Sequence, residues 1–219
     1  MQYKAIVFDL DGTLLDTLAD LGNSMNRVLR GQGFPVHPLD AYRYFVGNGT
    51  RLLVTRTLPE THRDEKTVKR CLSLFLEEYE QHWQDETRPY DGVPEMLDAL
   101  QAQELELTVF SNKPHDFTVL CVQKLLSKWR FRVIAGQRET VAPKPDPGGA
   151  LAIARTLNLS PSEFLYLGDT GTDMQTAVAA GMFPVGALWG FRPRKELLEY
   201  GARVLLEHPG DMLELLKSS

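Results

Sequence analysis

The sequence has little that would place it outside a reducing compartment or in a membrane. It contains only two cysteines, Cys71 and Cys121, fifty residues apart. This spacing fits neither a zinc site nor a disulfide framework, so we expect both thiols to be core residues. The apolar run near the N-terminus, residues 5–8, is too short for a signal peptide or a membrane span. These absences predict a cytoplasmic protein without a membrane partner.

An excess of positive charge is also missing. The chain has 24 Lys and Arg against 29 Asp and Glu, which gives a formal net charge of −5 over 219 residues. No global basic field is available to attract nucleic acid or anionic lipid, so we expect neither as a partner. An anionic substrate would therefore need a local positive site, such as a metal ion or a few well-placed Lys and Arg side chains.

The apolar pattern divides the chain into a helical segment and an α/β segment. Residues 4–8 form a compact apolar run that is typical of a buried parallel strand. Steps of three and four residues then predict helices throughout residues 17–85, without a strand pattern. After Gly92, predicted helices alternate with predicted strands at 105–110, 131–135, 164–167 and 184–188. This alternation predicts a parallel sheet covered on both faces.

The first strand belongs with these later strands, which makes the helical segment an insertion. We therefore predict an α/β fold with a doubly wound, Rossmann-like parallel sheet formed by residues 1–16 and 86–219. Residues 17–85 would form a helical cap inserted after the first strand. We also expect the two linkers, near 16–17 and 86–89, to let this cap open and close.

Four polar clusters follow predicted strands. They are Asp9-x-Asp11-Gly-Thr13, Ser111-Asn112-Lys113, Lys144 within Ala-Pro-Lys-Pro-Asp-Pro, and Asp169-Thr-Gly-Thr-Asp173. Any one alone could be a loop with helix caps, because Asp and Ser are common at caps and turns. Open α/β sheets bind ligands at the carboxyl ends of their strands, so all four clusters predict one shared site.

The residue types in these clusters favour phosphoryl chemistry. The four aspartates offer hard oxygen ligands without His or Cys, a set that favours Mg²⁺ over zinc. The metal ion and Lys144 would screen a phosphate so that a carboxylate can approach it. Ser111 and the backbone N–H groups after it, together with those near Gly12, could bind the non-bridging oxygens. Asp9 could then form an aspartyl-phosphate, while Asp11 exchanges protons with the leaving group and the attacking water.

The four clusters, in this order, resemble the four motifs of the haloacid dehalogenase (HAD) superfamily, and a helical cap after the first motif resembles its C1 cap class. The resemblance implies a Mg²⁺-dependent phosphatase with Asp9 as nucleophile and Asp11 as acid/base. It further implies roles for the remaining motif residues: metal binding by Asp9, the backbone carbonyl of Asp11 and Asp169; phosphate binding by Ser111, Asn112 and Lys144; and support of the metal site or orientation of Lys144 by Asp173.

Two other segments, Val46-Gly-Asn-Gly-Thr-Arg51 and Ala187-Leu-Trp-Gly-Phe-Arg192, resemble phosphoglycolate phosphatases. This resemblance implies that the substrate is a small phosphorylated metabolite, 2-phosphoglycolate. In the cap loop, Asn48, Gly49 and Arg51 are candidate specificity residues, because a guanidinium can bind a carboxylate with two hydrogen bonds.

Alternative functions stay open at this point. A pyrophosphatase and a broad-range sugar-phosphate phosphatase would use the same motifs. A β-phosphoglucomutase-like enzyme is less favoured, because Leu21 stands where those enzymes carry a His. A phospho-accepting signalling domain is the alternative from a different class, although such domains are shorter and have no cap. The sequence allows either a monomer or a homodimer.

Overall fold

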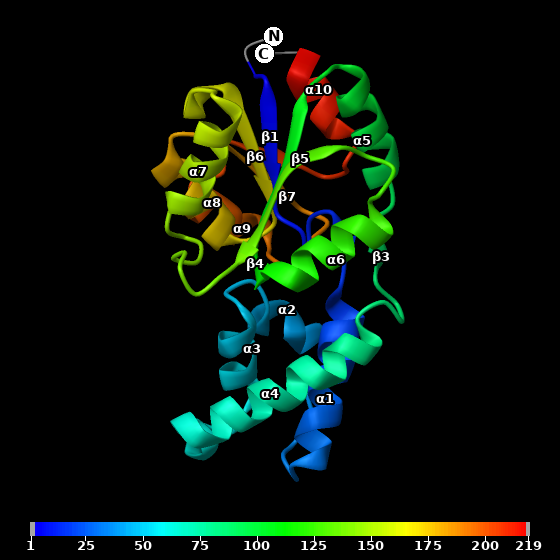
Figure 1. Ribbon diagram of the computed structural model, residues 1–219, viewed down its shortest axis with the longest axis vertical. Coiled ribbons are helices and arrows are strands. Elements are labelled where there is room, and N and C mark those ends of the chain that lie inside the picture. Colours follow the sequence, from blue (N-terminus) through cyan, green and yellow to red (C-terminus); the bar gives the residue numbers. More distant parts are fainter. Residues whose placement is uncertain (1–2, 218–219) are drawn as a thin grey trace.

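The main sheet runs in a single direction, so all its strands end at the same edge (Figure 1). The computed structural model describes residues 3–217. The strand order is β5-β4-β1-β6-β7-β8, and every neighbouring pair is parallel. The strands are β1 (Ala5–Phe8), β4 (Glu106–Pro114), β5 (Phe131–Gln137), β6 (Phe164–Gly168), β7 (Phe183–Ala187) and β8 (Val204–Leu206). The predicted α/β fold with a parallel sheet is confirmed.

Helices cover both faces of the sheet, and the central strand β1 packs against both layers. Ala5 and Val7 belong to the apolar cluster under α7 (Gly148–Leu157) and α8 (Gly171–Ala180). Ile6 and Phe8 point the other way, because successive side chains of a strand alternate. Their cluster includes residues of α5 (Val93–Ala102), α6 (His115–Leu125) and α10 (Asp211–Lys217). The short helix α9 (Arg194–Glu199) follows β7.

Four α-helices gather beyond the carboxyl edge of the sheet (Figure 1). They are α1 (Leu18–Gly31), α2 (Tyr42–Phe45), α3 (Thr50–Thr57) and α4 (Glu65–His82), with 3₁₀ turns at Leu39–Ala41, Glu60–His62 and, in the α/β part, Pro161–Glu163. We call residues 18–82 the helical block. Its long helices α1 and α4 pack together through a buried apolar stripe that includes Met25, Leu29 and Phe75.

The two connections between the helical block and the sheet are joined to each other. β2 (Leu15–Asp16) pairs antiparallel with β3 (Arg88–Pro89). The buried carboxylate of Asp20, in the first turn of α1, accepts the backbone N–H of Glu86 at 3.0 Å. It also accepts the backbone N–H and the hydroxyl of Thr87 at 2.8 and 2.7 Å. The entry and exit of the helical block are therefore held together by one side chain.

Three features differ from the sequence-based expectation. Residues 111–114 continue β4 instead of forming the loop after it, with a register shift between Phe110 and Pro114. The predicted helix at 39–46 is split into a 3₁₀ turn and a single α-turn, because the backbone is extended at Val46. After residue 188, β8, α9 and α10 were not predicted, since three to seven residues are too few to show a period.

Two expectations from composition concern the interior. Cys71 and Cys121 are both fully buried in the larger apolar cluster, as predicted. Within residues 3–217, no helix combines the length and the apolar character needed to cross a membrane.

We expect Asp20→Asn to lower the free energy of unfolding by about 1–3 kcal/mol, because an amide NH₂ would face N–H and O–H donors that now have a carboxylate acceptor. Urea unfolding measures this change. Asp40→Asn is the matched control: Asp40 is 86% exposed and pairs only at the surface with Arg43, so its loss should stay below about 1 kcal/mol. Equal losses in both variants would contradict the proposed importance of the Asp20 contacts.

Candidate active site

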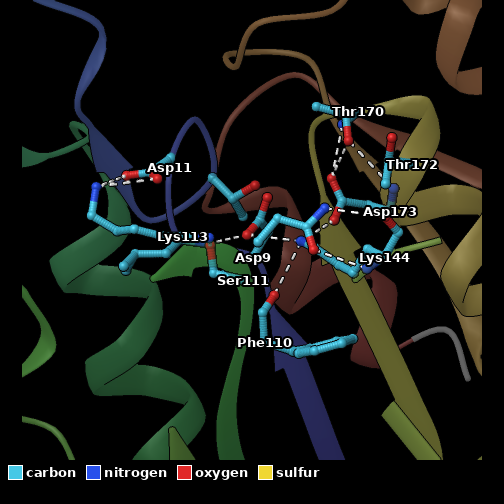
Figure 2. A network of polar contacts seen from close by, with 12 residues as sticks. Asp9, Asp11, Phe110, Ser111, Lys113, Lys144, Thr170, Thr172 and Asp173 are labelled. Carbon is cyan, nitrogen blue, oxygen red and sulfur yellow. Dashed lines mark hydrogen bonds and ion pairs between the residues drawn. The ribbon is translucent and has the colours of Figure 1, made fainter. Parts of the chain in front are cut away.

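Asp9 lies at the carboxyl end of β1 and forms an ion pair with Lys144 (Figure 2). The ammonium nitrogen of Lys144 is 2.9 Å from Oδ1 of Asp9 and 2.7 Å from Oδ1 of Asp173. It also donates to the backbone carbonyl of Phe110 at 3.1 Å. All three charged side chains are buried. Burial, reinforced by the charge of Asp173 and opposed by Lys144, raises the pKa of Asp9 to about 7.

Asp169 brings a third carboxylate to this point. Asp9, Asp169 and Asp173 each offer an oxygen, and these three atoms lie within 4.8 Å of one another. Burial, followed by the charges of Asp173 and Asp9, raises the pKa of Asp169 well above its usual range. Three crowded, buried carboxylates without His or Cys are an oxygen donor set that suits a hard divalent cation.

Neighbouring residues fix the orientation of Asp169 and Asp173. Asp169 accepts the Thr13 hydroxyl at 3.0 Å and the Phe191 backbone N–H at 2.8 Å. Asp173 accepts the backbone N–H and hydroxyl of Thr170 through Oδ2, which caps α8. The other oxygen of Asp173 accepts a hydrogen bond from Lys144. Asp173 therefore both helps to cap the N-terminus of α8 and orients the lysine.

Two glycines, Gly12 and Gly190, allow the chain to pass close to Asp169. Sequence reasoning considered only the backbone N–H groups near Gly12, as phosphate donors, and gave Gly190 no role. Gly12 has φ +86°, and a Cβ on it would lie 2.4 Å from the Asp169 carboxylate. A Cβ on Gly190 would lie 2.2 Å from Cβ of Asp169 and 2.4 Å from the Gly12 carbonyl oxygen. Gly190 belongs to the segment 187–192, whose resemblance to known phosphatases was the available signal.

Ser111 and Asn112 come from β4, where this strand passes the site. The Ser111 hydroxyl accepts the Lys113 N–H at 3.3 Å and lines the same cavity as Asp9. The Asn112 amide binds both backbone polar groups of Lys144, at 2.9 and 3.1 Å, and also donates to the Gly47 carbonyl at 3.2 Å. The side chain of Asn112 therefore holds Lys144 and the helical block in place.

Asp11 lines the cavity with Asp9, but its carboxylate faces a different lysine (Figure 2). The ammonium nitrogen of Lys113 is 3.0 and 3.3 Å from the two Asp11 oxygens and donates to the Tyr79 hydroxyl at 2.8 Å. Burial, the largest single effect, acts to lower the pKa of Lys113, but the charge of Asp11 and the interaction with Tyr79 together raise it. Sequence reasoning assigned no role to Lys113 or Tyr79.

Of the three candidate specificity residues in the helical block, Asn48, Gly49 and Arg51, only Gly49 lines the cavity. Gly49 lines the cavity, together with apolar side chains of the helical block. Asn48 donates to the Thr172 hydroxyl at 2.7 Å and accepts from Arg56, so it ties the loop after α2 to α8. Arg51 does not line the cavity: its side chain is 53% exposed and pairs with Glu65.

The comparison with known families agrees with this geometry. The family model described as haloacid dehalogenase-like hydrolase matches residues 6–187 of the chain. The protein belongs to this family of hydrolases.

Within this family, the chain is similar to proteins that are named as phosphatases. Phosphoglycolate phosphatase of Pseudomonas putida is 34% identical over 193 residues, 86% of this chain and 70% of that protein. N-acetylmuramic acid 6-phosphate phosphatase of Pseudomonas aeruginosa is 31% identical over 217 residues, 99% of this chain and 96% of that protein. A structure described as a predicted phosphoglycolate phosphatase from Haemophilus somnus has a TM-score of 0.90 at 26% identity, covering 99% of each chain.

We expect Gly190→Ala to lower the free energy of unfolding by about 1–3 kcal/mol, because the added methyl overlaps Asp169 and the Gly12 backbone. Chemical denaturation measures the loss. Gly210→Ala serves as the control, since a Cβ there would have no neighbour within 4 Å and should change stability by less than about 0.5 kcal/mol. A stable Gly190→Ala protein would show that Asp169 has room to move.

Proposed function

We propose that this hydrolase is a Mg²⁺-dependent phosphatase that cleaves a small phosphate monoester through an aspartyl-phosphate on Asp9. The observation that supports it most directly is the buried Asp9 carboxylate, which faces a cavity while Lys144 and two further carboxylates stand beside it. A nucleophile for a phosphate needs adjacent positive charge, and one lysine beside three carboxylates does not provide enough without a cation.

The residues present fit Mg²⁺. Asp9 and Asp169 would hold it, with the backbone carbonyl of Asp11 as the third protein ligand that the family resemblance implies. Asp173 lies close enough to join them, although both of its oxygens already have hydrogen-bond partners. When bound, Mg²⁺ would neutralise charge on the phosphate oxygens and on the crowded aspartates.

The protein's own residues divide the chemistry between them. Lys144 binds a non-bridging oxygen and orients Asp9, and the Ser111 hydroxyl donates to another. Asp9 attacks phosphorus as the bond to the leaving oxygen breaks, and Asp11 gives that oxygen a proton. Asp11 then takes a proton from the water that hydrolyses the aspartyl-phosphate, which returns both aspartates to their starting states and releases phosphate.

We further propose that residues 17–85 act as a cap over a core of residues 1–16 and 86–219. The helical block supplies the apolar wall of the cavity, which includes Leu53, Phe75 and Leu76. It is joined to the core by contacts such as Arg192 to the Val46 carbonyl at 2.9 Å. Such a wall would keep bulk water out of the site until the alcohol released in the first step has left.

The proposed substrate is 2-phosphoglycolate, as in the relative from Pseudomonas putida. N-acetylmuramic acid 6-phosphate is a second candidate, because the relative that bears its name covers this chain nearly end to end. A specific observation supports a larger leaving group: a groove between α4 and α6 shares Leu76, Pro114 and Phe117 with the site cavity. Its other lining residues include Ser73 and Glu77, which can bind hydroxyl groups.

We expect Asp9→Asn to abolish Mg²⁺-dependent phosphate release, with a loss of at least about 1,000-fold in kcat, because an amide cannot form the acyl-phosphate. Phosphate release from 2-phosphoglycolate, N-acetylmuramic acid 6-phosphate and pyrophosphate measures both activity and preference. Asp85→Asn, at an exposed aspartate beyond α4, is the control with unchanged turnover. Near wild-type turnover in Asp9→Asn would contradict the mechanism, and a preference for pyrophosphate would contradict the substrate class.

We expect Mg²⁺ to raise the melting temperature more at about pH 8 than at about pH 5.5. The folded pKa of Asp9, about 7, lies above the unfolded value of about 3.9, so the metal-free fold loses stability as pH rises between these values. Below pH 7 the cation must displace a proton, whereas at pH 8 it meets a carboxylate that is already ionised. Differential scanning fluorimetry with and without Mg²⁺ tests this, and a larger shift at the lower pH would contradict it.

A further inference from the structure

Lys113 occupies a place that the chemistry described so far leaves unexplained. Among residues 3–217, it is the only cationic side chain that lines the site cavity, and it is 3% exposed. Its ammonium nitrogen also lies 4.7 Å from the centre of the Tyr79 ring. The Asp11 carboxylate matches this buried charge, but the ammonium still faces the cavity, where it offers positive charge to an acidic group of a ligand.

The contact with Asp11 places this ammonium next to the leaving group. Under the proposed function, Asp11 must touch the esterified oxygen in order to protonate it. The ammonium nitrogen of Lys113 lies 3.0 and 3.3 Å from the oxygens of that same carboxylate. An acidic group one carbon away from the esterified oxygen would therefore come within hydrogen-bond distance of Lys113.

Both members of the Lys113–Tyr79 pair keep donor capacity for such a group. An ammonium has three N–H donors, and Lys113 makes three contacts, with both Asp11 oxygens and with Tyr79; a donor is left for a ligand when one N–H is shared between the two Asp11 oxygens. Because an ammonium only donates, the Tyr79 hydroxyl is the acceptor in their contact, which leaves its own O–H to donate. Tyr79 is 2% exposed and lines the cavity with Lys113, and the nearby wall is apolar at Phe75 and Phe117.

We propose that Lys113 and Tyr79 bind a second acidic group of the substrate, a carboxylate carried close to the esterified oxygen. This rests on the proposed function and deepens it, because the pair selects phosphate esters of hydroxy acids over esters of neutral alcohols. One donor comes from β4 and the other from α4, so the carboxylate is bound only where the helical block meets the sheet edge. Arg51, the sequence-based candidate for this role, pairs with Glu65 outside the cavity.

The experiment compares 2-phosphoglycolate with 2-hydroxyethyl phosphate, which has a neutral hydroxymethyl group in place of the carboxylate. Lys113 also supports Asp11, so Lys113→Met will lower kcat/KM for both esters. We expect the loss to be roughly 100-fold greater for 2-phosphoglycolate, because the site then lacks the charged partner of its carboxylate. Tyr79→Phe keeps the charge and removes one neutral donor, so its selective loss should be about 5- to 10-fold.

Lys128→Met is the matched control, because Lys128 also pairs with an aspartate, Asp98, and lies over an aromatic ring, but does so at the surface. It should change neither rate. Equal losses on the two esters in both Lys113→Met and Tyr79→Phe would overturn the proposal. A selective loss in Arg51→Met, with none in these two variants, would overturn it in favour of the cap loop.

A binding measurement separates this inference from the proposed function. In an Asp9→Asn background with Mg²⁺, calorimetry gives the affinity for each ester without turnover. Preferential binding of 2-phosphoglycolate that Lys113→Met removes would support the inference. If the wild type released no phosphate from either ester, the proposed function would fail, and the affinity ratio would still decide the role of Lys113.

Discussion

The crowding of negative charge at one buried edge is the constraint on which the rest of this structure depends. Asp9, Asp169 and Asp173 lie within a few ångströms of one another, and Asp11 lies on the other side of Asp9. Lys144 opposes part of this charge through two short ion pairs. Burial, together with this crowding, raises the pKa values of Asp9 and Asp169, and a divalent cation would relieve the crowding.

Much of the surrounding architecture holds this charge in place. Asn112 binds the backbone of Lys144, Thr170 binds Asp173, and the Phe191 N–H binds Asp169. These partners come from different strands or from the loops that follow them. A parallel sheet makes this possible because it delivers every strand end to the same edge. The sheet edge consequently holds the charged side of the site, and the helical block supplies its apolar wall.

The sequence predicted the fold and the core motifs well, for a physical reason. A polar residue directly after a buried apolar run is expected at a strand end, so Asp9 and Asp169 could be brought together without coordinates, and Lys144 followed from its place in the loop after the next predicted strand. Contacts across the boundary with the helical block follow no such rule. The contact between Lys113 and Tyr79 joins residues 34 apart on different elements. Arg51, in the first turn of α3, shows that a chemically suitable residue near the cavity can pair elsewhere.

The tail of the chain illustrates a second limit. Gly190 lies close to Asp169 because it has no side chain, and Phe191 binds Asp169 through its backbone N–H. Neither property can be recognised from the side-chain chemistry of the sequence. Only the resemblance of the segment 187–192 to known enzymes marked it. Short elements such as β8 were missed because three residues are too few to show a period.

The pairing of β2 with β3 makes the helical block a modular insert. The chain leaves the core and re-enters it at adjacent points, so the strand order of the main sheet does not depend on the segment between β2 and β3. The length and composition of the insert can change at little cost in loop closure, because that cost grows only slowly with length. Asp9 and Lys144 can thus stay constant while the insert is exchanged, so that under the proposed function one reaction serves leaving groups of different size and charge.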